Sequence, residues 1–319
     1  MATRSERTDT LRIRGCFVLM GAIGLAGCGD SLTTPTPHGA PADQPAKART
    51  VDVVAAVGPF DVEGSKMLAD PRDEVITPWL KKGVWEPVET ALFRSEIHAG
   101  DVVVDVGANV GYFTLIASQL VGDTGQVWAF EPDPDAFDLL RRNVELNGYK
   151  NVNLVPKALG AEPGTLKLFR HATNRGDHRV YDPGDGREAV DVEVTTLDKV
   201  FTAGTKIDVI KIDTQGAECA VAAGASKTLE RGTDMAVIME YTPHYIRQMG
   251  QDPQQCLRTI EGYGFSFYEI REFAPPKGVF KTDIEALQAR YSEAEEDYTN
   301  LFLPSRADVA KLGPVQRPR

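Results

Sequence analysis

A short apolar run that leads through a glycine-bearing turn into a helix is the feature that most constrains the fold. Residues 101–106 are rich in valine and show no apolar–polar alternation, as expected of a strand buried on both faces. Residues 107–111 contain two glycines, and an apolar helical pattern runs from Gly111 to Leu120. A strand that passes directly into a helix is the first half of a βα unit, which favours a parallel sheet.

The same rhythm continues along the chain. After a helical region at 78–98, the pattern predicts further strands and helices in alternation. The strands are expected at 126–130, 152–155, 207–212, 236–239, 265–270 and 300–303, and the helices at 134–147, 219–230 and 253–263. Two more segments, 165–170 and 190–195, alternate between apolar and polar residues. They predict a pair of antiparallel strands outside the βα pattern, which we call the excursion. The sequence therefore predicts an α/β fold with an open, mainly parallel sheet and helices on both faces.

Composition narrows the possible partners. The chain of 319 residues has a formal net charge of −11 at pH 7, which argues against a nucleic-acid backbone as partner. No Cys-x-x-Cys or His-rich spacing suggests a metal site. Cys219 and Cys256 are expected to be separate buried thiols.

The N-terminus has the pattern of an export signal. Basic residues precede the apolar run 16–27, which is too short to span a bilayer and ends in Leu-Ala-Gly-Cys. This ending resembles a lipobox, so 1–27 is interpreted as a lipoprotein signal peptide and Cys28 as the lipidated residue. After this signal we expect a Pro/Thr/Ala-rich linker (28–50), a folded domain (51–305) and a polar tail (306–319). The mature protein would then be anchored to a membrane of the bacterial cell envelope. The alternative is a chance apolar stretch upstream of a misassigned start codon, with a cytoplasmic protein.

The loop after the first strand and the end of the second strand suit a nucleoside. Gly107 permits a tight turn, and Gly111 allows the helix and strand to pack closely. The spacing is not G-x-G-x-x-G, so the loop lacks the pyrophosphate cradle that a nicotinamide-dependent oxidoreductase needs. Asp105 at the strand end would favour a cationic group, and Glu131 is placed to accept hydrogen bonds from ribose hydroxyls. The expected ligand therefore has ribose hydroxyls, a cationic group and no pyrophosphate, which is the chemistry of an adenosyl sulfonium.

Several blocks of this sequence, in this order, resemble the FkbM family of methyltransferases. They are DVGANVGYFT (105–114), FEPDP (130–134), RNVELN (142–147), VPKALG (155–160), VTTLD (194–198), IDVIKIDTQGAE (207–218) and NLF (300–302). The resemblance implies a Rossmann-like class I methyltransferase fold with a seven-stranded sheet. It also implies S-adenosyl-L-methionine as cofactor and, as acceptor, a hydroxyl on a sugar, a glycolipid or a polyketide-like small molecule.

The resemblance also implies roles for individual residues. Asp105, Gly107, Asn109 and Gly111 would line the methionine side of the cofactor. Glu131 would hold the ribose, the turn at Lys157 and Ala158 would border the adenine, and Asp213 would face the transferable methyl group. The family pattern Lys-Ile-Asp-Val-Glu-Gly becomes Lys-Ile-Asp-Thr-Gln-Gly here, so Gln215 replaces a carboxylate.

A hydroxyl acceptor must lose its proton during methyl transfer, so a nearby base is expected. Asp213 is the first candidate because it ends a strand over the expected site, and His178 and His244 are alternatives. Lys211 would point to the same face and could pair with Glu240 or Glu218. Two functions remain open. One is an O-methyltransferase. The other is a catalytically decayed, membrane-tethered lipoprotein with a binding or scaffold role, and it is suggested by Gln215 and by the signal.

Overall fold

The computed structural model describes residues 54–273, 275–291 and 297–307. The expected signal peptide, Cys28, the linker and residues 308–319 of the tail lie outside these ranges. Within them, no helix combines the length and the apolar character that crossing a membrane requires.

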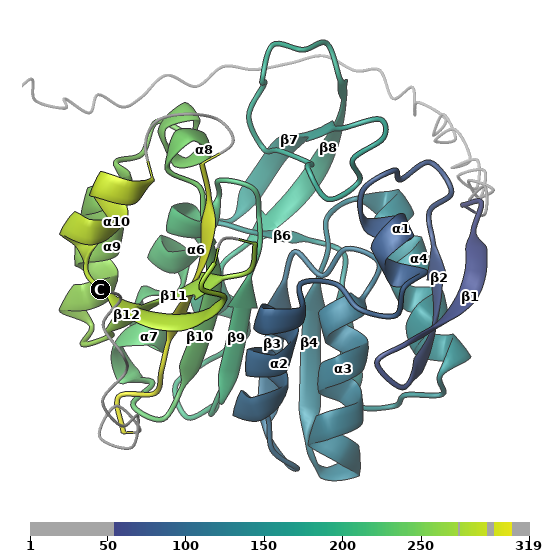
Figure 1. Ribbon diagram of the computed structural model, residues 1–319, viewed down its shortest axis with the longest axis horizontal. Helices are drawn as coiled ribbons and strands as arrows, with labels where there is room; N and C mark the ends of the chain where they lie inside the picture. The colour runs from purple at the N-terminus through teal and green to yellow at the C-terminus, as the bar shows by residue number, and fades with distance from the viewer. Residues whose placement is uncertain (1–53, 274, 292–296, 308–319) are drawn as a thin grey trace, which may run out of the picture. The chain divides into compact units, whose positions relative to one another are not determined.

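The main sheet has eight strands in the order β12-β11-β13-β10-β9-β3-β4-β5 (Figure 1). Neighbours among β5, β4, β3, β9 and β10 are parallel, and β13 is antiparallel to both β10 and β11. The bounds are β3 Val102–Val106, β4 Gln126–Phe130, β5 Val152–Val155, β9 Val209–Ile212, β10 Ala236–Tyr241, β11 Phe267–Arg271, β12 Gly278–Thr282 and β13 Thr299–Leu303. The expected fold class is confirmed. The strand count of seven is one short, because β12 adds an antiparallel edge strand to β11.

Successive valines of β3 face opposite sides of the sheet, because side chains alternate along a strand. Val103 belongs to one apolar core, together with Phe93 of α2, Leu115 of α3 and other residues of α4. Val104 belongs to the other core, which α6, α7, α9 and α10 cover. These helices span α2 Pro87–Glu96, α3 Tyr112–Val121, α4 Pro134–Leu146, α6 Glu218–Gly224, α7 Ser226–Arg231, α9 Pro253–Gly262 and α10 Ile284–Arg290. Helices on both faces are therefore confirmed.

Two small sheets accompany the main sheet. The predicted excursion forms the antiparallel strands β7 (Gly164–Arg170) and β8 (Glu188–Thr195), and β6 (Ala158–Leu159) pairs with β8. In Figure 1, β7 and β8 extend away from the main sheet at the top of the view. The hairpin of β1 (Val57–Val62) and β2 (Ser65–Ala69) has no counterpart in the sequence prediction.

Two expected helices are each broken in two. The helical region predicted at 78–98 consists of α1 (Ile76–Leu80) and α2. A turn with Gly83 at φ +88° separates them, and Pro87 then begins α2. The helix predicted at 219–230 divides at Ala225 into α6 and α7. The short helices α5 (Leu197–Val200) and α8 (Pro243–Gln248) complete the described α-helices.

The two cysteines of the body form a disulfide, which corrects the expectation of separate thiols. Cys219 lies at the start of α6 and Cys256 within α9, 37 residues apart in sequence, with their Cα atoms 5.7 Å apart. Both helices pack on the same face of the sheet. Sequence spacing could not reveal this pairing, because it depends on how α9 lies against α6.

Candidate functional site

The loop after β3 closely approaches the end of β9. Gly107 has φ +82°, and a Cβ atom added there would lie 1.9 Å from the carbonyl oxygen of Asp213. Only glycine fits such a contact in a left-handed conformation. Gly111, with φ +99°, lies against Leu140 of α4, whose Cδ1 would be 2.7 Å from an added Cβ. The two glycines thus bring the loop, the end of β9 and α4 together.

Glu131, which follows β4, is held by two backbone groups. Its Oε2 accepts a hydrogen bond from the amide of Asn109 at 2.7 Å, and its Oε1 accepts one from the amide of Asp133 at 2.7 Å. Burial, with a contribution from the charge of Asp133, raises the pKa of Glu131 to about 8. The carboxyl group therefore has a fixed orientation beside the loop that follows β3.

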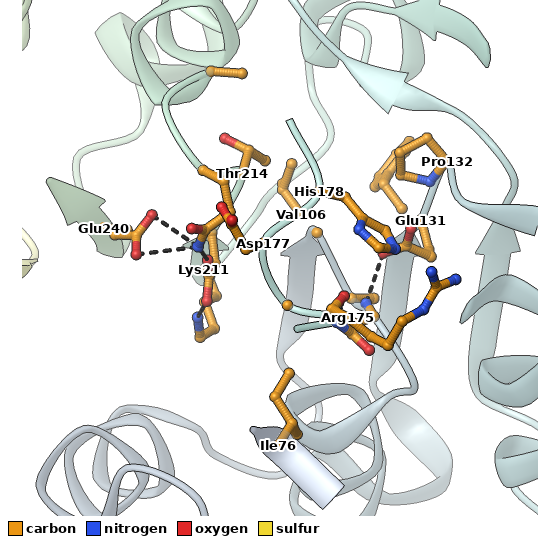
Figure 2. A pocket seen from close by; sticks show the side chains of 18 of the residues that line it. Ile76, Val106, Glu131, Pro132, Arg175, Asp177, His178, Lys211, Thr214 and Glu240 are labelled. Carbon is orange, nitrogen blue, oxygen red and sulfur yellow. Dashed lines mark hydrogen bonds and ion pairs between the residues drawn. The ribbon is translucent and has the colours of Figure 1, made fainter. Parts of the chain in front are cut away.

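A cavity of about 540 Å³ opens at the carboxyl ends of the parallel strands, where ligands bind in such sheets. Figure 2 shows Glu131 and Pro132 on one side of it and Lys211 and Glu240 on the other, with Val106 between them. The cavity therefore brings the ends of β3, β4, β9 and β10 to one site.

The residues expected to bind cofactor divide into two groups. Five line the cavity: Gly107, Asn109, Glu131, Lys157 and Ala158. Asp105 and Gly111 are not among the lining residues. Asp105 is buried and accepts a hydrogen bond from Thr114 Oγ1 at 2.6 Å, and burial raises its pKa to about 6. Its contact with α3 gives it a role in holding the loop rather than in facing the cavity.

Asp213 also lines the cavity and is paired with Lys211. The Nζ of Lys211 lies 3.1 Å from Asp213 Oδ2 and 3.2 Å from Glu89 Oε1, above the ring of Phe113. The sequence analysis proposed Glu240 or Glu218 as partners of Lys211, and the structure shows Asp213 and Glu89 instead. Burial acts to lower the pKa of Lys211, but Asp213 and Glu89 together with other carboxylates raise it well above its usual range.

Glu218 was proposed as a partner of Lys211, but in the structure it holds the turn after β9. Its carboxylate accepts hydrogen bonds from the backbone amides of Thr214 and Gly216 at 2.9–3.1 Å. Because Glu218 is the first residue of α6, its side chain fixes the turn between β9 and that helix. It thereby sets the position of Gln215 within the turn.

Two further carboxylates line the cavity beside Asp213. Glu86, the residue before α2, is buried in a left-handed conformation with φ +43°. Its Oε2 has no hydrogen-bond partner within the described residues. Glu240 of β10 is 9% exposed. Burial raises the pKa of both groups well above the usual range, with further contributions from Glu89 at Glu86 and from Asp213 at Glu240.

Sequence reasoning did not identify Glu86 as a site residue. The available signal was a glutamate directly before the proline that begins a helix, a position where a short capping side chain is more usual. Its meeting with Asp213 and Glu240 depends on α2 packing over the sheet.

The two candidate histidines lie in different environments. His178 lines the cavity, and its Nδ1 accepts a hydrogen bond from the amide of His171 at 3.1 Å. Burial and the nearby Arg175 lower its pKa to about 3, which weighs against a role as base. His244 lies in α8, with its ring against that of Tyr245, and is not among the lining residues.

Ion pairs join the segment after β7 to the start of α4. Arg170 Nε lies 2.6 Å from Asp133 Oδ2, and Arg175 Nη2 lies 3.4 Å from Asp133 Oδ1. The backbone carbonyl of Arg175 accepts a hydrogen bond from Asn109 Nδ2 at 3.0 Å. These contacts hold the excursion over the Glu131 side of the cavity. Within the described ranges, no group of three or more His, Cys, Asp or Glu side chains is arranged to bind a metal ion.

Comparison with solved structures finds methyltransferases. A SAM-dependent O-methyltransferase from Thermotoga maritima matches at 11% identity and a TM-score of 0.39, covering 76% of this chain and 71% of that one. Aeropyrum pernix fibrillarin with natively bound S-adenosyl-L-methionine matches at 11% identity and a TM-score of 0.37, covering 68% and 74%.

Relatives with detectable sequence similarity are also methyltransferases. "Methyltransferase sdnD" of Sordaria araneosa is 28% identical over 206 residues, which cover 54% of this chain and 77% of the relative. A "Probable cobalt-precorrin-6B C(15)-methyltransferase (decarboxylating)" of Sulfurisphaera tokodaii is 37% identical over 137 residues, covering 38% and 71%. The model of the family "Methyltransferase FkbM domain" matches residues 105–267. The chain therefore belongs to the FkbM family of methyltransferases, with S-adenosylmethionine as its cofactor.

Proposed function

We propose that this chain transfers a methyl group from S-adenosylmethionine to a hydroxyl of a polyhydroxylated small molecule, such as a sugar, a glycolipid or a polyketide-like acceptor. One observation carries the proposal. A single cavity has the Glu131 carboxyl group on one side and the Glu240 carboxyl group on the other (Figure 2), and Asp213, which Gln215 links to Glu240, also lines it. This arrangement suits a nucleoside at one end and a hydrogen-bond-donating acceptor at the other.

The residues on the Glu131 side fit an adenosyl cofactor. The cavity volume of about 540 Å³ lies within the roughly 300–1,000 Å³ typical of small-molecule sites. Glu131 would accept hydrogen bonds from both ribose hydroxyls, and Lys157 and Ala158 would border the adenine. Gly107 and Asn109 would lie along the methionine portion. The cofactor supplies an electrophilic methyl group on sulfur when it is bound.

The residues on the other side fit an acceptor rich in hydrogen-bond donors. Glu86, Asp213 and Glu240 can accept hydrogen bonds, and the buried Oε2 of Glu86 has no partner in the described part of the chain. A buried carboxyl oxygen without a partner is costly, so a ligand hydroxyl that donates to it would be favoured. Asp213, paired with Lys211, would orient the acceptor beside the methyl group.

Calorimetry with S-adenosylmethionine, S-adenosylhomocysteine and NAD tests the cofactor site. The protein should bind the first two and not NAD, and Glu131→Ala should weaken binding severely. Equal affinity of wild type and Glu131→Ala would contradict the ribose role. Asp213→Asn should abolish methyl transfer to a panel of methyl glycosides while leaving cofactor affinity within a few-fold, and unchanged turnover would contradict its role.

The decayed-scaffold alternative is tested by the same panel. Gln215 motivated that alternative, but the cavity retains Asp213 and Glu240 beside it. A decayed protein would bind S-adenosylhomocysteine and methylate no acceptor.

We also propose that the protein is exported and anchored through Cys28. The disulfide of Cys219 and Cys256 supports export, because such bonds persist mainly in oxidising compartments. Metabolic labelling with a fatty-acid analogue should label the wild type and not Cys28→Ser. An unlabelled wild type would show that the lipobox interpretation is wrong.

A further inference from the structure

Gln215 joins the two carboxylates on the acceptor side of the cavity. Its Nε2 donates to Asp213 Oδ1 at 3.0 Å and to both oxygens of Glu240 at 3.1 Å. Its backbone is left-handed, with φ +53°, which turns the side chain toward β10. The amide nitrogen must be the end that faces the two carboxylates, because the amide oxygen would be repelled by both.

The two carboxylates differ in how they are neutralised. Asp213 Oδ2 is paired with the Lys211 ammonium at 3.1 Å, while its Oδ1 accepts from Gln215, so both oxygens are engaged. Glu240 instead receives its hydrogen bonds from the neutral amide of Gln215. Asp213 is therefore in contact with a cation, whereas no ion pair of Glu240 is found in the described part of the chain.

We propose that Glu240 is the catalytic residue that accepts the proton of the acceptor hydroxyl, and that Gln215 is a positioning residue that orients it. The inference rests on the proposed methyl transfer to a hydroxyl. It explains the departure at position 215: the carboxylate absent there is supplied by Glu240, 3.1 Å away. A carboxylate at 215 would lie against two others and be repelled.

The step balances in atoms and charge. The acceptor oxygen forms a bond to the methyl carbon while the bond from that carbon to sulfur breaks, and the electron pair of the broken bond stays on sulfur. The hydroxyl proton passes to Glu240. The carboxylate thereby becomes a neutral acid, and the positive charge of the sulfonium is lost.

Burial and the charges around Glu240 favour its protonated form. Among the described residues, the titratable groups that interact with it include Lys211 of β9, Asp213 directly after that strand, Glu218 of α6, Glu86 before α2, and Tyr298 before β13. Burial, Asp213, Glu218 and Glu86 raise the pKa of Glu240 well above its usual range, and Lys211 opposes them. A carboxylate whose pKa is raised binds a proton more tightly than an ordinary glutamate does, which suits the proposed role as proton acceptor.

An infrared titration tests the proposal without an acceptor. The carbonyl stretch of protonated carboxyl groups is followed against pH in the full protein saturated with S-adenosylhomocysteine. Wild type should show a titrating band that Glu240→Gln lacks, and an identical band in both proteins would overturn the proposal. Gln215→Leu removes a hydrogen bond to the charged form, so the midpoint of the band should move to higher pH. An unchanged midpoint would contradict the positioning role.

Turnover provides the second measurement, with S-adenosylmethionine and a panel of methyl glycosides as probes. Glu240→Gln should lower kcat by about 10²–10⁴-fold, the usual contribution of a positioned base, with unchanged affinity for S-adenosylhomocysteine. The double variant Gln215→Glu/Glu240→Gln returns a carboxylate to the neighbouring position and should recover part of the rate. Full activity of Glu240→Gln with the wild-type pH profile would overturn the proposal.

The two measurements separate this inference from the proposed function. A wild type that binds S-adenosylhomocysteine and methylates none of the glycosides would contradict the proposed function, and is the result expected of a decayed scaffold. The infrared titration would still test the protonation of Glu240 and its contact with Gln215, because it needs no acceptor.

Discussion

The loop at Gly107 lies so close to the carbonyl oxygen of Asp213 that an added Cβ would be 1.9 Å from it. This contact joins the cofactor side of the cavity to its acceptor side. We expect Gly107→Ala to force the two strand ends apart. The left-handed backbone costs roughly 1–2 kcal/mol, and the clash adds roughly 1–3 kcal/mol. Thermal unfolding and calorimetry with S-adenosylhomocysteine should show a lower Tm and weaker binding.

Gly148→Ala is the matched control for this variant. Gly148 also has a positive φ, +71°, but an added Cβ there would meet nothing within 4 Å. It should show the backbone cost alone and normal cofactor binding. Equal losses in the two variants would mean that the contact with Asp213 is not constraining.

The pKa of Glu131 predicts a pH dependence of stability. Its value in the folded protein is about 8, against an ordinary 4.5, so the folded state holds the proton more tightly than the unfolded chain. The contribution of this group to stability is therefore full below about pH 4.5 and is lost as the pH rises through 8. Each tenfold difference in proton affinity between the two states is worth about 1.4 kcal/mol, so the loss is on the order of a few kcal/mol.

Glu131→Gln cannot ionise and should lack this dependence. The difference in free energy of unfolding between wild type and variant should shift in favour of the variant between pH 5 and 8 (about the window set by the two pKa values). Chemical denaturation at several pH values measures it. A constant difference would show that Glu131 does not titrate in this range.

Lys211→Met should be strongly destabilising. The variant leaves the buried carboxylate of Glu89 and the partly exposed carboxylate of Asp213 without their cation, and removing one partner of a buried pair typically costs about 3–5 kcal/mol. The exposed pair of Arg141 and Glu145 is the control, because Arg141→Met should cost under about 1 kcal/mol. Similar denaturation midpoints for the two variants would contradict this view of Lys211.

Reduction of the disulfide should lower stability. Closing a loop across the 37 residues between Cys219 and Cys256 stabilises the folded state by about 4 kcal/mol in the chain-entropy estimate. Dithiothreitol should therefore lower the Tm of the wild type. It should have no effect on Cys219→Ser/Cys256→Ser, whose Tm should match that of the reduced wild type. A wild-type Tm that ignores the reductant would contradict the prediction.

Local sequence pattern determined the strand–helix rhythm and the class of fold. Short apolar runs such as 126–130 and 152–155 were placed with the bounds that the structure shows, because a strand of a parallel sheet has a local signature in its apolar residues. The turn at 107–111 was also identified from local pattern, because the left-handed conformations of Gly107 and Gly111 favour glycine.

Tertiary packing decided which further carboxylates join the predicted residues in the site. Glu86 precedes α2 and Glu240 lies in β10, more than a hundred residues away, yet both line one cavity with Asp213. The partner of Cys219 and the partners of Lys211 were likewise set by which helix and strand lie next to each other. Sequence spacing carries the period of a helix or a strand, but it does not carry the distance between elements that meet only after the sheet has formed. Asp213 could therefore be proposed as a site residue from its position at a strand end, whereas its link through Gln215 to Glu240 depends on β10 lying beside β9 in the folded sheet.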